Sequence, residues 1–171
     1  FTGREFTRHP HRFGVSELTE HLPILLIVLP LVAAPLCVIL HQRTAAYTLA
    51  LLVSWITFGI SIALVAQVNQ TGVIRYNLGG WAPPYGIEYL VDSLSSFVMM
   101  FVSGIGAIVL VYAPKSVDDE IARSKHYLFY ATYLLCLTGL MGMCVTGDLF
   151  NVFVFLEISS LSSYALISLG Q

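Results

Sequence analysis

One ionisable side chain, Glu157, stands near the middle of an apolar stretch, residues 147–169, that is long enough to cross a membrane. A carboxylic acid at the centre of a spanning helix costs about 2.5 to 3.5 kcal/mol to insert, so such acids usually face a partner or water and usually serve transport. The chemistry that this position predicts is therefore reversible binding of a proton. The structural alternative is a carboxylate that holds helices together or pairs with a basic residue of another subunit.

Hydroxyl groups follow Glu157 along one face of the expected helix, at about 100° per residue. The residues that carry them are Ser160, Tyr164 and Ser168. On the amino-terminal side the same face carries Phe150 and Phe153, which would keep that end dry. The pattern predicts a one-sided proton path from Glu157 toward the carboxyl end. Ser159 and Ser163 lie away from Glu157 and indicate close packing against another helix.

Three further residues are weaker candidates for the same proton path. Asp148 stands where the helix begins, so we interpret it first as an N-cap for free backbone N–H groups and second as a proton entrance. His126 opens the preceding apolar run, and an imidazole ordinarily titrates near pH 6.5, which suits a relay. Tyr130 follows it by one helical turn. A lone histidine at the membrane edge is, however, more often a bystander.

Other chemistries find little support in the sequence. Neither the histidines of the amino-terminal tail nor the three cysteines have metal-ligand spacing, so we expect no metal site and no cofactor. The net charge of −2 gives no basic field, and we expect no binding to nucleic acid.

Composition places the chain in the membrane class. It is 57% hydrophobic and 11% charged, with a mean hydropathy of +0.80, whereas soluble proteins have about 25% charged residues. We predict an all-α polytopic membrane protein with a polar, basic tail at residues 1–21 and one transmembrane domain at 22–170. Its five transmembrane helices are expected at about 22–40, 45–68, 89–112, 126–145 and 148–169.

The connections between these helices differ in kind. Residues 69–88 form an extramembrane loop, in which VIRYNL at 73–78 alternates like a short strand and the turn-rich part that follows carries aromatic residues at intervals. Asp92 is interpreted as a helix cap, or else as an outer relay group. Residues 114–125 are charged and indicate a solvated connection. Only residues 146–148 separate the last two spans, which predicts an antiparallel helical hairpin, with Gly139 and Gly142 allowing close approach.

The orientation in the membrane is weakly indicated by charge. Arginines at 4, 8, 12 and 75 fall on one side, and basic residues at 43, 115, 123 and 125 fall on the other. The arginines of the distant tail count for less, which favours an amino terminus on the outside.

Two segments carry a resemblance to a known family: GGWAPPYGIEYLVDSLS at 79–95 and GMCVTGDLFNVFVFLEISSLSSYALI at 142–167. They resemble the proton-conducting antiporter-like family, shared by Mrp-type multisubunit cation/proton antiporters, membrane-bound hydrogenases and respiratory complex I, and are most similar to the D-type subunits of Mrp antiporters. The TGDLFNVFVFLE run is the specific part, because it joins a tight turn to a helix with its glutamate in a defined place. The resemblance covers most of residues 22–170.

The resemblance implies that Glu157 matches the family's essential glutamate of the fifth helix. In the family this acid works with a lysine on a later helix, within about fourteen spans arranged as inverted repeats. No lysine lies inside an apolar span of this sequence, which stops at Gln171. We therefore expect the amino-terminal part of a family member, or a split or incompletely observed subunit, that would not transport alone.

The function that we expect is that of a membrane subunit in a multisubunit monovalent cation/proton antiporter, exchanging protons and Na⁺ or another monovalent cation. Its partners would be other membrane subunits and the lipid bilayer, and its location the bacterial plasma (inner) membrane. The first alternative is a proton-pumping subunit of a redox-driven complex, either NADH-quinone oxidoreductase or a membrane-bound hydrogenase. The second is a scaffold subunit that takes no part in transport.

Overall fold

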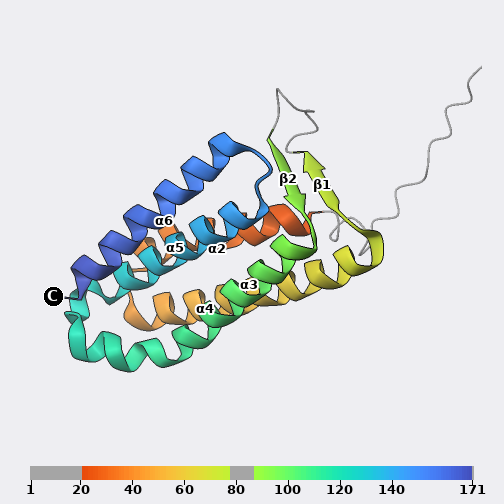
Figure 1. The fold of residues 1–171 in the computed structure, drawn as a ribbon. Coiled ribbons are helices and arrows are strands. Elements are labelled where there is room, and N and C mark those ends of the chain that lie inside the picture. Colours follow the sequence, from red (N-terminus) through yellow and green to blue (C-terminus); the bar gives the residue numbers. More distant parts are fainter. Residues whose placement is uncertain (1–20, 78–86, 171) are drawn as a thin grey trace, which may run out of the picture.

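The computed structural model describes residues 21–77 and 87–170, and these residues form a helical bundle with a small β-hairpin at one end (Figure 1). Five of its helices are long and apolar enough to cross a membrane. The elements are α2 (Leu22–Leu40), α3 (Arg43–Thr71), β1 (Ile74–Asn77), β2 (Glu88–Val91), α4 (Ser93–Glu120), the short 3-10 helix η2 (Arg123–Lys125), α5 (His126–Val145) and α6 (Leu149–Leu169). The predicted fold class, an all-α polytopic membrane protein, is confirmed.

Two of the expected helix bounds need correction. The helix predicted at 45–68 extends from Arg43 to Thr71. The helix predicted at 89–112 begins only at Ser93, because the four residues before Asp92 form a strand. Asp92 then caps the helix: its carboxylate accepts from the Ser95 amide at 2.7 Å, and the Ser95 hydroxyl accepts from the Asp92 amide at 2.9 Å. These bonds lower the pKa of Asp92.

The charged connection predicted at 114–125 is also mostly helical. Helix α4 continues through Pro114 to Glu120, so that only five residues, including η2, separate it from α5. Charge in a sequence marks exposure to water but does not end a helix. In this segment Asp118, in the last turns of α4, forms an ion pair with Arg43 of α3.

The extramembrane hairpin is built from β1 and β2, which pair antiparallel with Ile74 opposite Val91 and Tyr76 opposite Tyr89. The short strand predicted near 73–78 is therefore confirmed, whereas its partner strand was predicted as the start of a helix. Tyr89 is 6% exposed and belongs to the hydrophobic core. Burial, and less so the nearby Tyr76, raises the pKa of Tyr89. Trp81 and Tyr85 lie outside the described residues.

Helices α2, α3, α4 and α5 pack around a shared core, and α6 lies against α5 at the edge of the bundle (Figure 1). The core has two hydrophobic clusters. One contains Leu26, Leu64 and Met141 and lies under the hairpin; the other contains Leu110 and Leu134 and lies toward the opposite end. Most of the α6 surface is left uncovered by the described residues.

Candidate functional site

Helix α6, which carries Glu157, starts at a defined cap. The Phe150 amide donates to the Asp148 carboxylate at 3.2 Å, and the backbone N–H of Val152 donates to the Asp148 carbonyl at 3.1 Å. A carboxylate at this position also interacts favourably with the helix dipole. The first interpretation of Asp148, as an N-cap, is confirmed by these bonds.

The hairpin fixes the turn before α6, a contact that the sequence did not predict. The Gly147 amide donates to the carbonyl of Glu88 at 3.0 Å, and Thr146 forms a β-bridge with Tyr89. Strand β2 is thus paired on both edges, with β1 on one side and with the α5–α6 turn on the other. Gly147 is the one residue of the turn whose type reflects this contact. A methyl group at that position would lie 3.3 Å from the carbonyl oxygen of Glu88, which leaves little room for a side chain.

Close packing against α5 decides which face of α6 is buried. A methyl group added at Gly139 would lie 2.7 Å from the backbone oxygen of Phe155 and from the backbone nitrogen of Ser159. At Gly142 it would lie 2.2 Å from the Phe155 ring. Ser159 is 8% exposed in this contact, and the Ser163 hydroxyl lies 3.5 Å from the Cys136 thiol. The predicted roles of the two glycines and the two serines in helix packing are therefore confirmed.

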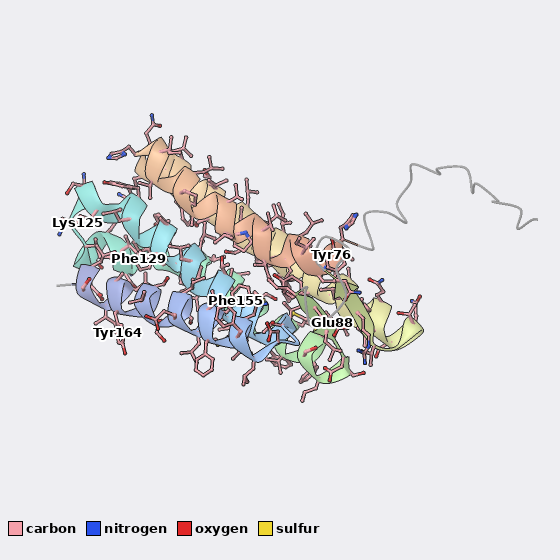
Figure 2. All side chains as sticks on the ribbon, turned by 90° about the horizontal axis from the view of Figure 1, so that it is seen from above. Tyr76, Glu88, Lys125, Phe129, Phe155 and Tyr164 are labelled. Carbon is pink, nitrogen blue, oxygen red and sulfur yellow. The ribbon has the colours of Figure 1, made fainter. Side chains whose placement is uncertain are left out.

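Glu157 lies on the outward side of α6 together with much of its predicted path. The side chains of Glu157, Tyr164 and Ser168 are exposed, and Ser160 is half-buried. Figure 2 shows Tyr164 pointing away from the bundle, whereas Phe155 lies where α6 meets α5. The apolar neighbours on this side are also uncovered; they include Phe150, Phe153, Leu161 and Ile167.

The hydroxyls of this face do not form a chain with Glu157 inside the described part of the protein. Ser168 donates to the carbonyl of Ala165 at 2.9 Å, within its own helix. Among the described residues, no hydrogen bond or ion pair to the Glu157 carboxylate is found. What the arrangement offers is a single carboxylate on an open, mostly apolar helix face.

His126 and Tyr130 belong to a different place from Glu157. Both are buried, and they lie where α5 meets the rest of the bundle: the Tyr130 ring packs against Tyr47 of α3 with the centroids 5.5 Å apart. The structure thus separates the predicted path into two groups. Ser160, Tyr164 and Ser168 share the outer helix with Glu157, whereas His126 and Tyr130 do not reach that face through the described residues.

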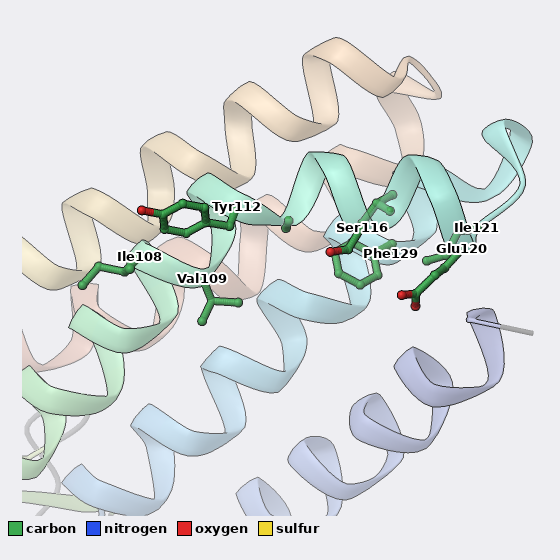
Figure 3. A pocket seen from close by; sticks show the side chains of 9 residues that line it. Ile108, Val109, Tyr112, Ser116, Glu120, Ile121 and Phe129 are labelled. Carbon is green, nitrogen blue, oxygen red and sulfur yellow. The ribbon is translucent and has the colours of Figure 1, made fainter.

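The described residues contain no cluster of three or more His, Cys, Asp or Glu side chains that could hold a metal ion. A shallow pocket of about 320 Å³ opens between α4 and α5, lined by Val109, Tyr112, Ser116 and Phe129 with Glu120 at its mouth (Figure 3). Glu157 does not line this pocket. The carboxylate at the pocket is that of Glu120, at the end of α4.

The helices and the solitary acid together define a multi-pass helical membrane protein with an ionisable group inside one span. Two relatives have known assignments. The N subunit of NADH-quinone oxidoreductase from Desulforudis audaxviator is 40% identical over 157 residues, or 90% of this chain and 31% of the relative. The D subunit of the Na(+)/H(+) antiporter from Alkalihalophilus pseudofirmus is 39% identical over 111 residues, or 65% of this chain and 22% of the relative. No protein-family model matches the chain.

Solved structures agree with these relatives. The Mrp complex of Dietzia sp. DQ12-45-1b matches 87% of the chain with a TM-score of 0.76 and 25% identity. The membrane-bound sulfane sulfur reductase, an archaeal respiratory membrane complex, matches 85% with a TM-score of 0.77 and 30% identity. The chain is therefore homologous to the D subunits of Na(+)/H(+) antiporters and to the N subunit of NADH-quinone oxidoreductase, and the resemblance carried by residues 79–95 and 142–167 is confirmed. The chain spans less than a third of the length of each of the two relatives.

Proposed function

We propose that the chain is part of a membrane subunit in a multisubunit monovalent cation/proton antiporter, and that Glu157 is the group that binds and releases protons. The observation that carries the proposal is the position of Glu157. It is an acid in the middle of α6, and it lies on the face that the described bundle leaves open. An uncompensated carboxylate in hydrocarbon is unfavourable, so this face requires water or another protein surface around Glu157.

The scaffold alternative fits this position less well. A carboxylate that only joined helices would be expected between α6 and α5, where the contact between the two helices is made. That contact is instead formed by two glycines of α5 and by serine, cysteine and phenylalanine side chains. Glu157 lies on the other side of α6, free to meet a cationic group or a water-filled path. The proposed path continues over Ser160, Tyr164 and Ser168, with Asp148 as a candidate proton entrance at the start of the helix.

A redox-driven proton pump is the second candidate function, and two similarities favour it. One relative is a subunit of NADH-quinone oxidoreductase, and one structural neighbour is a respiratory complex. In this version Glu157 has the same role, but the driving reaction belongs to partner subunits. For either function, we propose a multi-pass location in the bacterial inner membrane and assembly with other membrane subunits.

The two candidates differ in what drives proton movement across the membrane. Everted vesicles that contain the full complex would be loaded with a proton gradient and followed with a pH-sensitive dye. We expect a pulse of Na⁺ or K⁺ to dissipate the gradient at once, without an electron donor, because an antiporter couples protons to cations directly. Proton uptake that requires NADH or another reductant, and no response to either cation, would contradict the antiporter and favour the redox-driven pump.

The orientation of the subunit gives a separate prediction. We expect the hairpin to face the outside and the α4–α5 connection to face the cytoplasm. Cysteines placed at the exposed positions Val73 and Ser124, in a version without native cysteines, should differ in labelling by an impermeant thiol reagent added to intact cells. Val73→Cys should react and Ser124→Cys should react only after the membrane is opened. The reverse pattern would invert the topology.

A further inference from the structure

The buried imidazole of His126 has one nitrogen that is bonded and one that is not. Its side chain is 0% exposed. Nε2 lies 2.8 Å from the backbone oxygen of Ile121, and because a carbonyl can only accept, Nε2 carries a proton. Nδ1 has no hydrogen-bond partner among the described residues. A buried polar atom without a partner is uncommon and calls for a physical explanation.

A carboxylate oxygen lies close to this unbonded nitrogen. Nδ1 lies 3.6 Å from Oδ1 of Asp118, near the end of α4. In the neutral imidazole with Nε2 protonated, Nδ1 presents a lone pair, and two acceptors that face each other cannot bond. A second proton would convert Nδ1 into a donor directed at the carboxylate, which gives a charge-assisted hydrogen bond.

Asp118 already has a partner on its other oxygen. Oδ2 accepts from the guanidinium of Arg43, the first residue of α3. A proton on His126 would therefore place this carboxylate between two cations, which come from α3 and from α5. The three elements that meet at this point are the start of α3, the end of α4 and the start of α5.

We propose that His126, Asp118 and Arg43 form a proton-binding clasp at the end of the bundle opposite the hairpin. When His126 is protonated, Asp118 bonds to α3 and α5 together, and the α4–α5 connection is held. When His126 is neutral, only the Arg43 pair remains and the connection opens more readily. The clasp is separate from Glu157, which lies on the outer face of α6, and it does not depend on the function proposed for that residue.

The other ionisable groups around the clasp are of two kinds. His41 from the α2–α3 turn stacks on Tyr127 with the ring centroids 4.3 Å apart, and its Nδ1 lies 2.8 Å from the Val38 carbonyl, so it is engaged elsewhere. Tyr47 and Tyr130 pack against each other, and a phenol ordinarily loses its proton only near pH 10. The charged residues of the same end, Asp119, Glu120, Arg123 and Lys125, are exposed to solvent and are screened.

Hydrogen–deuterium exchange of the full-length subunit in its assembled complex can test the clasp. The amides of Ile121 and Lys125 are held by the carbonyls of Val117 and Ala122, so a peptide that covers 117–125 reports opening of the connection. After correction for the intrinsic pH dependence of exchange, we expect about tenfold slower exchange at pH 5.5 than at pH 8.5, the effect of one additional charge-assisted bond.

Variants separate the clasp from other causes. Asp118→Ala removes the acceptor and His126→Phe removes the proton while keeping a ring; each should abolish the difference between the two pH values. Arg43→Gln leaves His126 and Asp118 in place and should keep it, as should Glu157→Gln. The proposal is wrong if the wild-type peptide shows no corrected pH dependence, or if Asp118→Ala, whose position is partly exposed and tolerant of truncation, retains the wild-type response.

Discussion

Cation-driven proton exchange by the assembled complex is expected to fall to the level of vesicles without the complex when Glu157 is replaced by Gln. Glutamine has nearly the same volume and can still form hydrogen bonds, but it cannot exchange a proton. The remaining groups of the open face of α6, Ser160, Tyr164 and Ser168, carry hydroxyls, and a hydroxyl cannot substitute for a carboxylic acid as proton carrier. The measurement is the dye response to a sodium pulse in everted vesicles. Glu157→Asp, which keeps the acid on a shorter side chain, should retain part of the activity.

The matched control for this variant is Glu120→Gln, because Glu120 is an exposed acid at the end of α4. The complex that carries Glu120→Gln should exchange protons at the normal rate. Assembly is measured in parallel by purification of the intact complex. Normal exchange by Glu157→Gln would exclude Glu157 as proton carrier. A complex that no longer assembles with Gln at this position would instead support the scaffold function, because a structural carboxylate is needed for its contacts and not for its proton.

A second large effect is expected from Gly139→Ala, which should separate α6 from α5. The added methyl group would meet backbone atoms of Phe155 and Ser159 at 2.7 Å, and backbone cannot rotate aside. Overpacking of this kind typically costs about 1 to 3 kcal/mol. We expect a lower midpoint of thermal unfolding of the full-length subunit in detergent. The midpoint is measured by size-exclusion chromatography after heating.

Gly59→Ala is the control, because Gly59 lies in α3 with no atom within 4 Å of an added methyl group. Alanine is favoured over glycine in a helix interior by about 1 kcal/mol, so this variant should be as stable as the wild type or slightly more stable. The two substitutions are chemically identical, and only Gly139→Ala is expected to lower the midpoint. A Gly139→Ala protein with an unchanged midpoint would show that the α5–α6 contact is looser than the structure indicates.

The helices were predictable from the sequence because long apolar runs have few alternatives in a membrane. The four residues of β2, EYLV, were not predictable as a strand. They stand just before an apolar helix, and a strand of four residues is too short for its periodicity to distinguish it from the start of that helix. A different limitation hid the end of α4. Pro114 and the charged residues after it suggested a loop, yet α4 continues to Glu120, where Asp118 pairs with Arg43, a residue far away in the sequence.

The candidate site was predictable in part. The position of Glu157 and the packing role of Ser159 and Ser163 follow from helical periodicity alone, because both depend on one helix. The separation of His126 from Glu157 does not, because periodicity gives the faces of each helix but not the angle at which two helices face each other. The proximity of His126 to Asp118 also depends on where α4 ends, and the sequence predicts that end too early.

The double pairing of β2 has a mechanical consequence for the proposed proton carrier. Strand β2 anchors the turn at Gly147 to the hairpin, and α5 packs along the inner side of α6, so that α6 is held at its first end and along one face while its outer face stays free. Glu157 lies about 15 Å along α6 from this anchor, at the helical rise of about 1.5 Å per residue, which is near half of a bilayer core of about 30 Å. Because both contacts hold α6, the distance from this end of the helix to Glu157 is set by the helical rise. Through this distance the hairpin would set the depth at which we propose that Glu157 exchanges protons.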